Sequence, residues 1–153
     1  MSERYPIHIV KNKHQLQTAL KIREIVFAKE QGISKNMDVD GKDQQALHAL
    51  VFDQGVGIAT GRLLCEKDQK GYISRIAVLN NYRGRKLGSR IVEFLELEAK
   101  KLGALEVYLY PHDYLESFYH NLGYQTVPNS GFFVGRYRLI KMTKNISLKT
   151  TET

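Results

Sequence analysis

The strongest constraint on the fold comes from residues 72–103, in which a buried strand passes through a glycine-bearing turn into an amphipathic helix. Tyr72–Leu79 alternates and then becomes continuously apolar, which predicts a strand whose end is buried on both faces. Apolar residues then recur at helical spacing from Leu87 to Leu102, with charged residues opposite them, and Gly103 follows as a cap. A strand that leads into such a helix predicts a domain in which helices pack on a β-sheet.

The other segments extend this pattern to an α/β (α+β) domain with a mixed sheet, because three hairpin-linked strands precede a β-α-β unit. A polar loop, Ile33–Gln44, separates the first helix from the hairpins, and its aspartates lack the final glutamate of a calcium loop, so no metal is expected. The expected helices are Asn12–Gln31, Leu87–Leu102 and Asp113–Asn121. The expected strands are Tyr5–Val10, Ala46–Phe52, Val56–Cys65, Tyr72–Leu79, Leu105–Tyr110, one that starts at Gly123, and Phe132–Met142.

Length and composition indicate one globular domain that is not exported. The 153 residues suit a single domain over residues 1–143, followed by a polar, flexible tail over residues 144–153. The first residues lack an apolar signal core, and no stretch is apolar enough to span a membrane, so a cytoplasmic location is expected. The single cysteine, Cys65, is expected to be a small, half-buried apolar residue.

The basic character of the chain is most concentrated where the turn enters the second helix. The net charge is +7, which suits either a polyanion or a small, highly charged anion as ligand. Here Arg83, Arg85 and Lys86 alternate with Gly84 and precede Gly88. Unpaired amides at a helix start, glycines that allow close approach, and full positive charges together predict a site for a pyrophosphate. The spacing fits neither a Walker loop nor a Rossmann fingerprint, and a plain helix start with a solvated basic turn is the alternative.

Two blocks of sequence resemble the GNAT superfamily of N-acetyltransferases. Arg83-Gly84-Arg85-Lys86-Leu87-Gly88, after a strand that ends Ile-Ala-Val, resembles the acetyl-CoA-binding motif of that family, although Lys86 stands where a glycine is usual. Tyr110–Tyr124 resembles a second family block in its Phe-Tyr pair and its Leu-Gly-aromatic ending, with His112 where the family commonly has asparagine. Arg23–Gly32, with Asp40-Gly41 and His48 after it, resembles the ElaA-like branch. The resemblance covers residues 5 to 142 and implies a mostly antiparallel sheet of about seven strands flanked by helices.

The resemblance also implies a reaction, in which a neutral amine of a small molecule attacks the thioester of acetyl-CoA directly. It implies that Tyr119 protonates the leaving thiolate and that the backbone of Ile76–Val78 polarises the carbonyl. Glu30, His48 and His112 are candidate bases, and Arg75 is expected to be a strand residue without a role. The implied cofactor-binding residues are Ile76, Ala77, Val78, Arg83, Gly84, Arg85, Lys86, Leu87, Gly88, Ser89, His112 and Phe118.

Three other functions stay open on the sequence. The acceptor could be a protein or peptide, or the chain could be a CoA-binding module without turnover. Nucleic-acid binding is a further reading of the net charge, but the chain has no helix-turn-helix, RNP or zinc pattern, so no nucleic-acid partner is expected. Family members are often dimers, which makes a homodimer one assembly that the resemblance allows.

Overall fold

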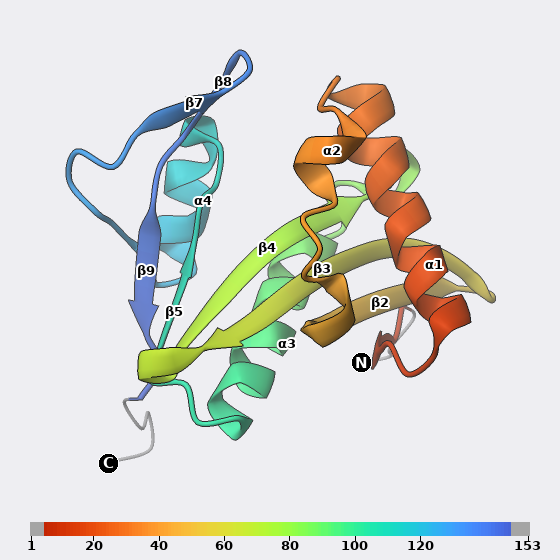
Figure 1. Cartoon of the computed structure of the whole chain (residues 1–153), viewed down its shortest axis with the longest axis horizontal. Helices are drawn as coiled ribbons and strands as arrows, with labels where there is room; N and C mark the ends of the chain where they lie inside the picture. The colour runs from red at the N-terminus through yellow and green to blue at the C-terminus, as the bar shows by residue number, and fades with distance from the viewer. Residues whose placement is uncertain (1–4, 148–153) are drawn as a thin grey trace. The chain divides into compact units, whose positions relative to one another are not determined.

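The computed structural model describes residues 5–147 (Figure 1). These residues divide into two compact units. The first unit contains residues 5–64 and 75–95, and the second contains residues 65–74 and 96–147. The elements β3, β4 and α3 each contribute residues to both units.

The seven-stranded sheet has the order β1-β2-β3-β4-β5-β9-β6, and a separate hairpin pairs β7 with β8. The β4–β5 pair is parallel, through Lys70–Tyr72 and Glu106–Tyr108, whereas the β1–β2, β2–β3, β5–β9 and β6–β9 pairs are antiparallel. This confirms the mixed, mostly antiparallel sheet. The strands are β1 (Ile7–Ile9), β2 (Leu47–Asp53), β3 (Val56–Glu66), β4 (Lys70–Val78), β5 (Glu106–Leu109), β6 (Gln125–Thr126), β7 (Phe132–Val134), β8 (Tyr137–Leu139) and β9 (Met142–Asn145).

The helices begin and end largely where the sequence predicts. Asn12 caps the first helix by accepting a hydrogen bond from the Gln15 amide at 2.8 Å. The first helix is α-helical only to Arg23 and continues as a π-helical segment, after which Gly32 turns the chain at φ 72°. The helices are α1 (Lys13–Arg23), the π-helical segment η1 (Glu24–Glu30), α2 (Lys35–Asp38), α3 (Leu87–Lys101) and α4 (Glu116–Asn121). Within residues 5–147, none of them has the length and apolar character needed to cross a bilayer.

In the first unit, helices pack on both faces of β3. Figure 1 shows α1 lying across β2 and β3 with α2 beside it, and the core here joins Ala19, Ile22 and Val26 to Leu50 and Ala77. A Cβ on Gly57 would lie 2.5 Å from Thr18 of α1, and a Cβ on Gly61 would lie 2.5 Å from Ile91 of α3. Glycine is therefore needed at both positions of β3, because each helix lies too close to the strand for a side chain.

Three expectations about the chain require correction. The run Phe132–Met142 is not one strand, because Gly135 at φ 60° turns the chain between β7 and β8. Lys144 does not begin a tail, since it lies in β9, while residues 148–153 of the expected tail lie outside the described residues. Cys65 is exposed rather than half-buried.

Candidate active site

The basic turn, defined here as residues 83–89, joins β4 to α3 in the first unit. After Val78 the chain makes one 3-10 turn at Asn80–Tyr82, and it then takes left-handed conformations at Gly84 (φ 81°) and Lys86 (φ 63°). The helix starts at Leu87, so the first amides of α3 have no acceptor within their own helix. A turn of this kind, followed by a helix N-terminus, presents N–H groups and partial positive charge to an anion.

The three cations of the basic turn have different surroundings. Arg83 donates to the Val78 carbonyl at 2.9 Å and to the Glu30 carboxylate at 2.6 Å. Arg85 bonds to the Tyr5 hydroxyl and lies 5.2 Å from the ring centre of Tyr82. Lys86 is exposed, and no hydrogen bond or ion pair of its ammonium is recorded among residues 5–147. Arg83 and Arg85 therefore also stabilise the turn, and Lys86 carries the charge that is most available to a ligand.

Gly88 lies in the first turn of α3, where the fold makes no demand for glycine. A Cβ placed on this residue would meet no atom within 4 Å, and its φ is not left-handed. Glycine in a helix costs about 1 kcal/mol relative to alanine. Its presence at an open helix start thus suits a group that approaches the backbone from outside.

The two candidate bases of the first unit are both held by other groups. Glu30, at the end of η1, accepts the charged hydrogen bond from Arg83, and its side chain is 32% exposed. His48 is only 3% exposed; its Nε2 lies 2.9 Å from the Asp43 carbonyl, and its Nδ1 has no hydrogen-bond partner among the described residues. Burial lowers the pKa of His48, which keeps the ring neutral at pH 7.

A second charged group, which we call the arginine–aspartate cluster, lies in the same unit and was not predicted. It consists of Arg23 from α1, Arg62 from β3 and Arg75 from β4, together with Asp38 at the end of α2 and Asp40 and Asp43 in the loop between α2 and β2. The hydrogen bond from Arg62 lowers the pKa of Asp40, and bonds from Arg23 and Arg62 outweigh the burial that would raise the pKa of Asp43. The aspartates that suggested a loop in the sequence thus hold that loop to three elements.

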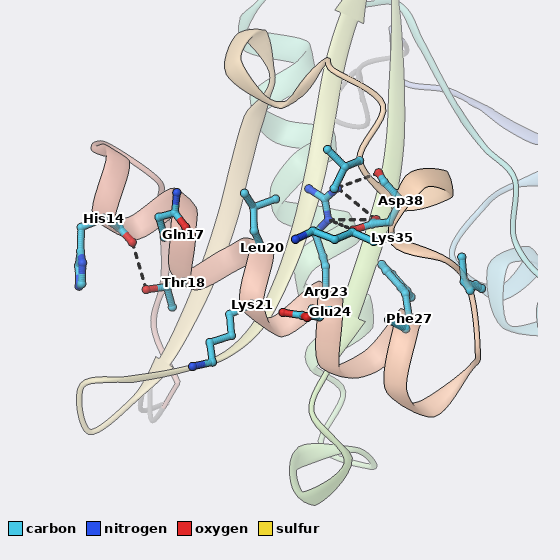
Figure 2. Close-up of a pocket in the computed structure, with 13 residues that line it drawn as sticks. His14, Gln17, Thr18, Leu20, Lys21, Arg23, Glu24, Phe27, Lys35 and Asp38 are labelled. Atoms are coloured by element: carbon cyan, nitrogen blue, oxygen red, sulfur yellow. Dashed lines mark hydrogen bonds and ion pairs between the residues drawn. The ribbon is translucent and has the colours of Figure 1, made fainter.

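The loop also forms one wall of a groove of about 460 Å³ (Figure 2). Apolar side chains of Leu20, Phe27 and Val39 line it, and the paired Arg23 and Asp38 lie at one side. Charged groups from both walls add Lys21, Glu24 and Lys35 to the lining. Figure 2 shows Arg23 reaching toward Asp38, whereas His14 and Lys21 point away from it. The groove is large enough for a small molecule with apolar and charged parts.

The second unit contains the remaining predicted site residues. Tyr119 of α4 is buried, burial raises its pKa to about 12, and no hydrogen bond of its hydroxyl to a described residue is recorded. The neighbouring Phe118 is 39% exposed and meets Tyr119 edge-on at 4.9 Å. His112 stacks on Tyr114 at 5.1 Å and contacts Tyr137 edge-on at 4.8 Å, while burial lowers its pKa.

The end of α4 is anchored by an ion pair of β9. Lys144 donates to the Glu96 carboxylate at 2.9 Å and to the Leu122 carbonyl at 2.8 Å. The hydroxyl of Tyr124 bonds to the same carboxylate at 2.7 Å, and its ring meets Tyr119 edge-on at 5.7 Å. This network fixes the turn that follows Tyr119.

A family model described as an acetyltransferase (GNAT) domain matches residues 14–146. The chain belongs to the GNAT acetyltransferase family. Among its relatives is YjcF of Bacillus subtilis strain 168, named as an uncharacterized N-acetyltransferase, with 31% identity over 137 residues that cover 90% of this chain and 97% of that protein.

Solved structures of GNAT proteins share the fold. Escherichia coli ElaA superposes with a TM-score of 0.82 at 23% identity, covering 92% of this chain and 99% of ElaA. The likeness to ElaA expected from the sequence is confirmed at the level of the fold. The PaiA N-acetyltransferase of Thermoplasma acidophilum, described as a complex with coenzyme A, gives a TM-score of 0.66 at 20% identity, covering 92% of this chain and 99% of that one.

Proposed function

We propose that this GNAT protein is an acyl-CoA-dependent N-acyltransferase that moves an acetyl group to a primary amine of a small molecule. The observation that carries the proposal is the basic turn, where left-handed Gly84 and Lys86 precede an open helix start at Gly88. These residues fit the diphosphate of coenzyme A, because backbone amides, an ammonium without a partner in residues 5–147 and unobstructed backbone lie in one short segment. Family membership and the coenzyme A complex of the PaiA neighbour support the same ligand.

In the proposed reaction, acyl-CoA supplies the thioester and this chain supplies polarisation and proton transfer. The backbone N–H groups of Ile76–Val78 polarise the carbonyl oxygen. The lone pair of the amine then forms the C–N bond as the C–S bond breaks, and the sulfur leaves as a thiolate that takes the proton of Tyr119. With a pKa of about 12, Tyr119 keeps that proton across the neutral range until a thiolate is formed.

The attacking amine must also lose a proton, and Glu30 is the better placed of the two candidate bases in the first unit. Its carboxylate is partly exposed and can meet a water, whereas the His48 ring is enclosed. Because Arg83 already donates to Glu30, we propose that the proton passes through water rather than by direct contact. We assign His48 to the support of the loop through the Asp43 carbonyl.

For the acceptor, we propose the groove beside α1 and the loop that contains Asp38 and Val39. Its volume of about 460 Å³ suits a small molecule better than an extended peptide. The exposed carboxylate of Glu24 offers a partner for an ammonium group, and Leu20 and Phe27 offer apolar contact. A protein or peptide acceptor is the alternative that an acceptor panel would distinguish.

The test is turnover of acetyl-CoA with a panel of small amines and lysine-containing peptides, followed through the free thiol of released CoA. Wild type is expected to release CoA with at least one small amine, and Tyr119→Phe to lower kcat by about 10² to 10³-fold at unchanged acetyl-CoA affinity. Tyr114→Phe, which removes the hydroxyl of an exposed tyrosine in the same unit, serves as the control. Equal kcat for wild type and Tyr119→Phe would remove Tyr119 from the reaction, and release with peptides alone would assign a peptide acceptor.

A further inference from the structure

Arg75 has an unusual backbone conformation for a residue in the middle of a strand. Its φ of 56° is left-handed, although it lies within β4 between Ile73 and Ala77, whose side chains are buried. A non-glycine residue in this region is strained, and such strain persists only where the surroundings hold it in place. The strand is therefore bent directly before Ile76–Val78.

The side chain of Arg75 supplies a contact that holds this conformation. Its Nε lies 3.1 Å from the Asp38 carbonyl oxygen and 3.0 Å from the Asp38 carboxylate, and its Nη2 lies 3.3 Å from the carboxylate of Asp40. The side chain of Asp38 is 9% exposed and that of Arg75 is 18% exposed, so water screens these charges only partly. Arg75 thus lies at the bend of β4 and also binds the loop of residues 38–43.

The other arginines of the cluster hold the same loop from different elements. Arg23 binds Asp38 and Asp43, and Arg62 binds Asp40 and Asp43. Neither lies in β4, so Arg75 is the member that connects the loop to the strand of Ile76–Val78. Asp38 and Val39 in turn line the groove beside α1 (Figure 2).

We infer that Arg75 is a positioning residue that couples the acyl-binding stretch of β4 to the loop of residues 38–43. Binding of acyl-CoA at Ile76–Val78 restrains the backbone of β4 in its bent conformation. Because the Arg75 guanidinium contacts Asp38 and Asp40, the loop becomes restrained as well. The loop wall of the groove is then set when the thioester is in place. This inference rests on the proposed function, because it takes Ile76–Val78 as the place where the acyl group binds.

Hydrogen–deuterium exchange with acetyl-CoA as the probe tests the coupling without knowledge of the acceptor. In wild type, acetyl-CoA is expected to slow amide exchange both at residues 76–79 and at residues 38–43. Arg75→Gly keeps the left-handed backbone at no steric cost and removes the side chain. In this variant, acetyl-CoA is expected to protect residues 76–79 only, and the loop is expected to exchange about tenfold faster with and without ligand.

Two further variants complete the test. Asp40→Asn breaks the contact from the loop side and is expected to weaken the ligand-induced protection of residues 38–43. Arg136→Gly, at an exposed arginine beside Gly135, is the matched control and is expected to keep the wild-type response. The inference is overturned if acetyl-CoA protects the loop equally in wild type and Arg75→Gly, or protects only β4 in wild type. If wild type does not bind acetyl-CoA at all, it is the proposed function that fails.

Discussion

The basic turn and the arginine–aspartate cluster both contain arginines of the first unit, but they differ in how those charges are paired and buried. In the cluster, three arginines meet three aspartates, and Arg23 and Arg62 are almost fully buried. In the basic turn, the cations are exposed and Lys86 has no recorded partner among the described residues. The comparison teaches that a run of positive charge does not by itself identify a ligand site. We infer a ligand site only where a cation and backbone amides have no partner among the described residues.

The largest effect expected from this contrast is on stability. Asp43→Ala leaves the buried guanidinium groups of Arg23 and Arg62 without a shared carboxylate, and we expect the free energy of unfolding to fall by about 3 to 5 kcal/mol. Urea unfolding followed by circular dichroism measures the change. Lys86→Ala, in the basic turn, is the matched control and should change the free energy by less than about 0.5 kcal/mol. Similar losses in both variants would contradict the distinction between the two regions.

The next largest effect is on acetyl-CoA binding. Gly88→Leu fills the open space at the start of α3, and we expect acetyl-CoA affinity to fall about 100-fold or more, since the phosphates can no longer approach the backbone. Calorimetric titration measures the affinity, and thermal unfolding is expected to stay close to wild type. Glu93→Leu places the same side chain on an exposed position of the same helix and should bind acetyl-CoA normally. Normal affinity in Gly88→Leu would remove the helix start from the ligand site.

A change of pH should act on the side of the arginine–aspartate cluster, through His48, whose Nε2 lies 2.9 Å from the Asp43 carbonyl. Because burial lowers the pKa of His48 below its unfolded value of about 6.5, stability is fully present above that pH and is lost as pH falls and the unfolded chain takes up the proton. The loss amounts to at most about 1.4 kcal/mol per pH unit for this group. Urea unfolding at pH 7 and pH 5.5 measures it. His48→Gln should flatten this dependence, and an equally steep dependence in that variant would assign it to another group.

The smallest effect concerns the left-handed backbone of Lys86. Lys86→Gly should stabilise the chain by about 1 kcal/mol, because glycine adopts φ 63° without strain. It should also weaken acetyl-CoA binding a few-fold through the lost charge. Lys86→Ala loses the same charge and keeps the strain, so the difference between the two variants in thermal unfolding isolates the backbone term. Equal stability of both variants would show that the turn is unstrained.

Features that depend on neighbouring residues could be predicted from the sequence, whereas contacts between residues far apart in the sequence could not. The Asn12 cap, the β2–β3 hairpin and the extent of α3 each depend on neighbouring residues, and all are confirmed. The arginine–aspartate cluster was missed because its partners lie 15 to 37 residues apart, where spacing gives no signal. Arg75 was assigned no role for the same reason. The β7–β8 turn did have a local signal in Gly135, which the aromatic residues around it obscured.

Within the candidate site, the basic turn could be predicted from the sequence. Which of its cations form contacts within the protein could not. Arg83 and Arg85 find their partners in Glu30 and Tyr5, which are 53 and 80 residues away in the sequence. The position of Lys86, by contrast, carried a usable signal: a residue that stands where the family has glycine adopts the conformation that favours glycine. The roles of Tyr119 and Glu30 stay predictions.

The most direct test of the central claim is calorimetric titration of the wild-type chain with acetyl-CoA, with coenzyme A in a parallel titration. The account predicts saturable binding of both ligands in the micromolar range, one molecule per chain. It also predicts that binding weakens in Gly88→Leu and not in Glu93→Leu. No binding of either ligand at millimolar concentration would contradict the account, because an open basic turn would then be a feature of the fold and not a site for acyl-CoA.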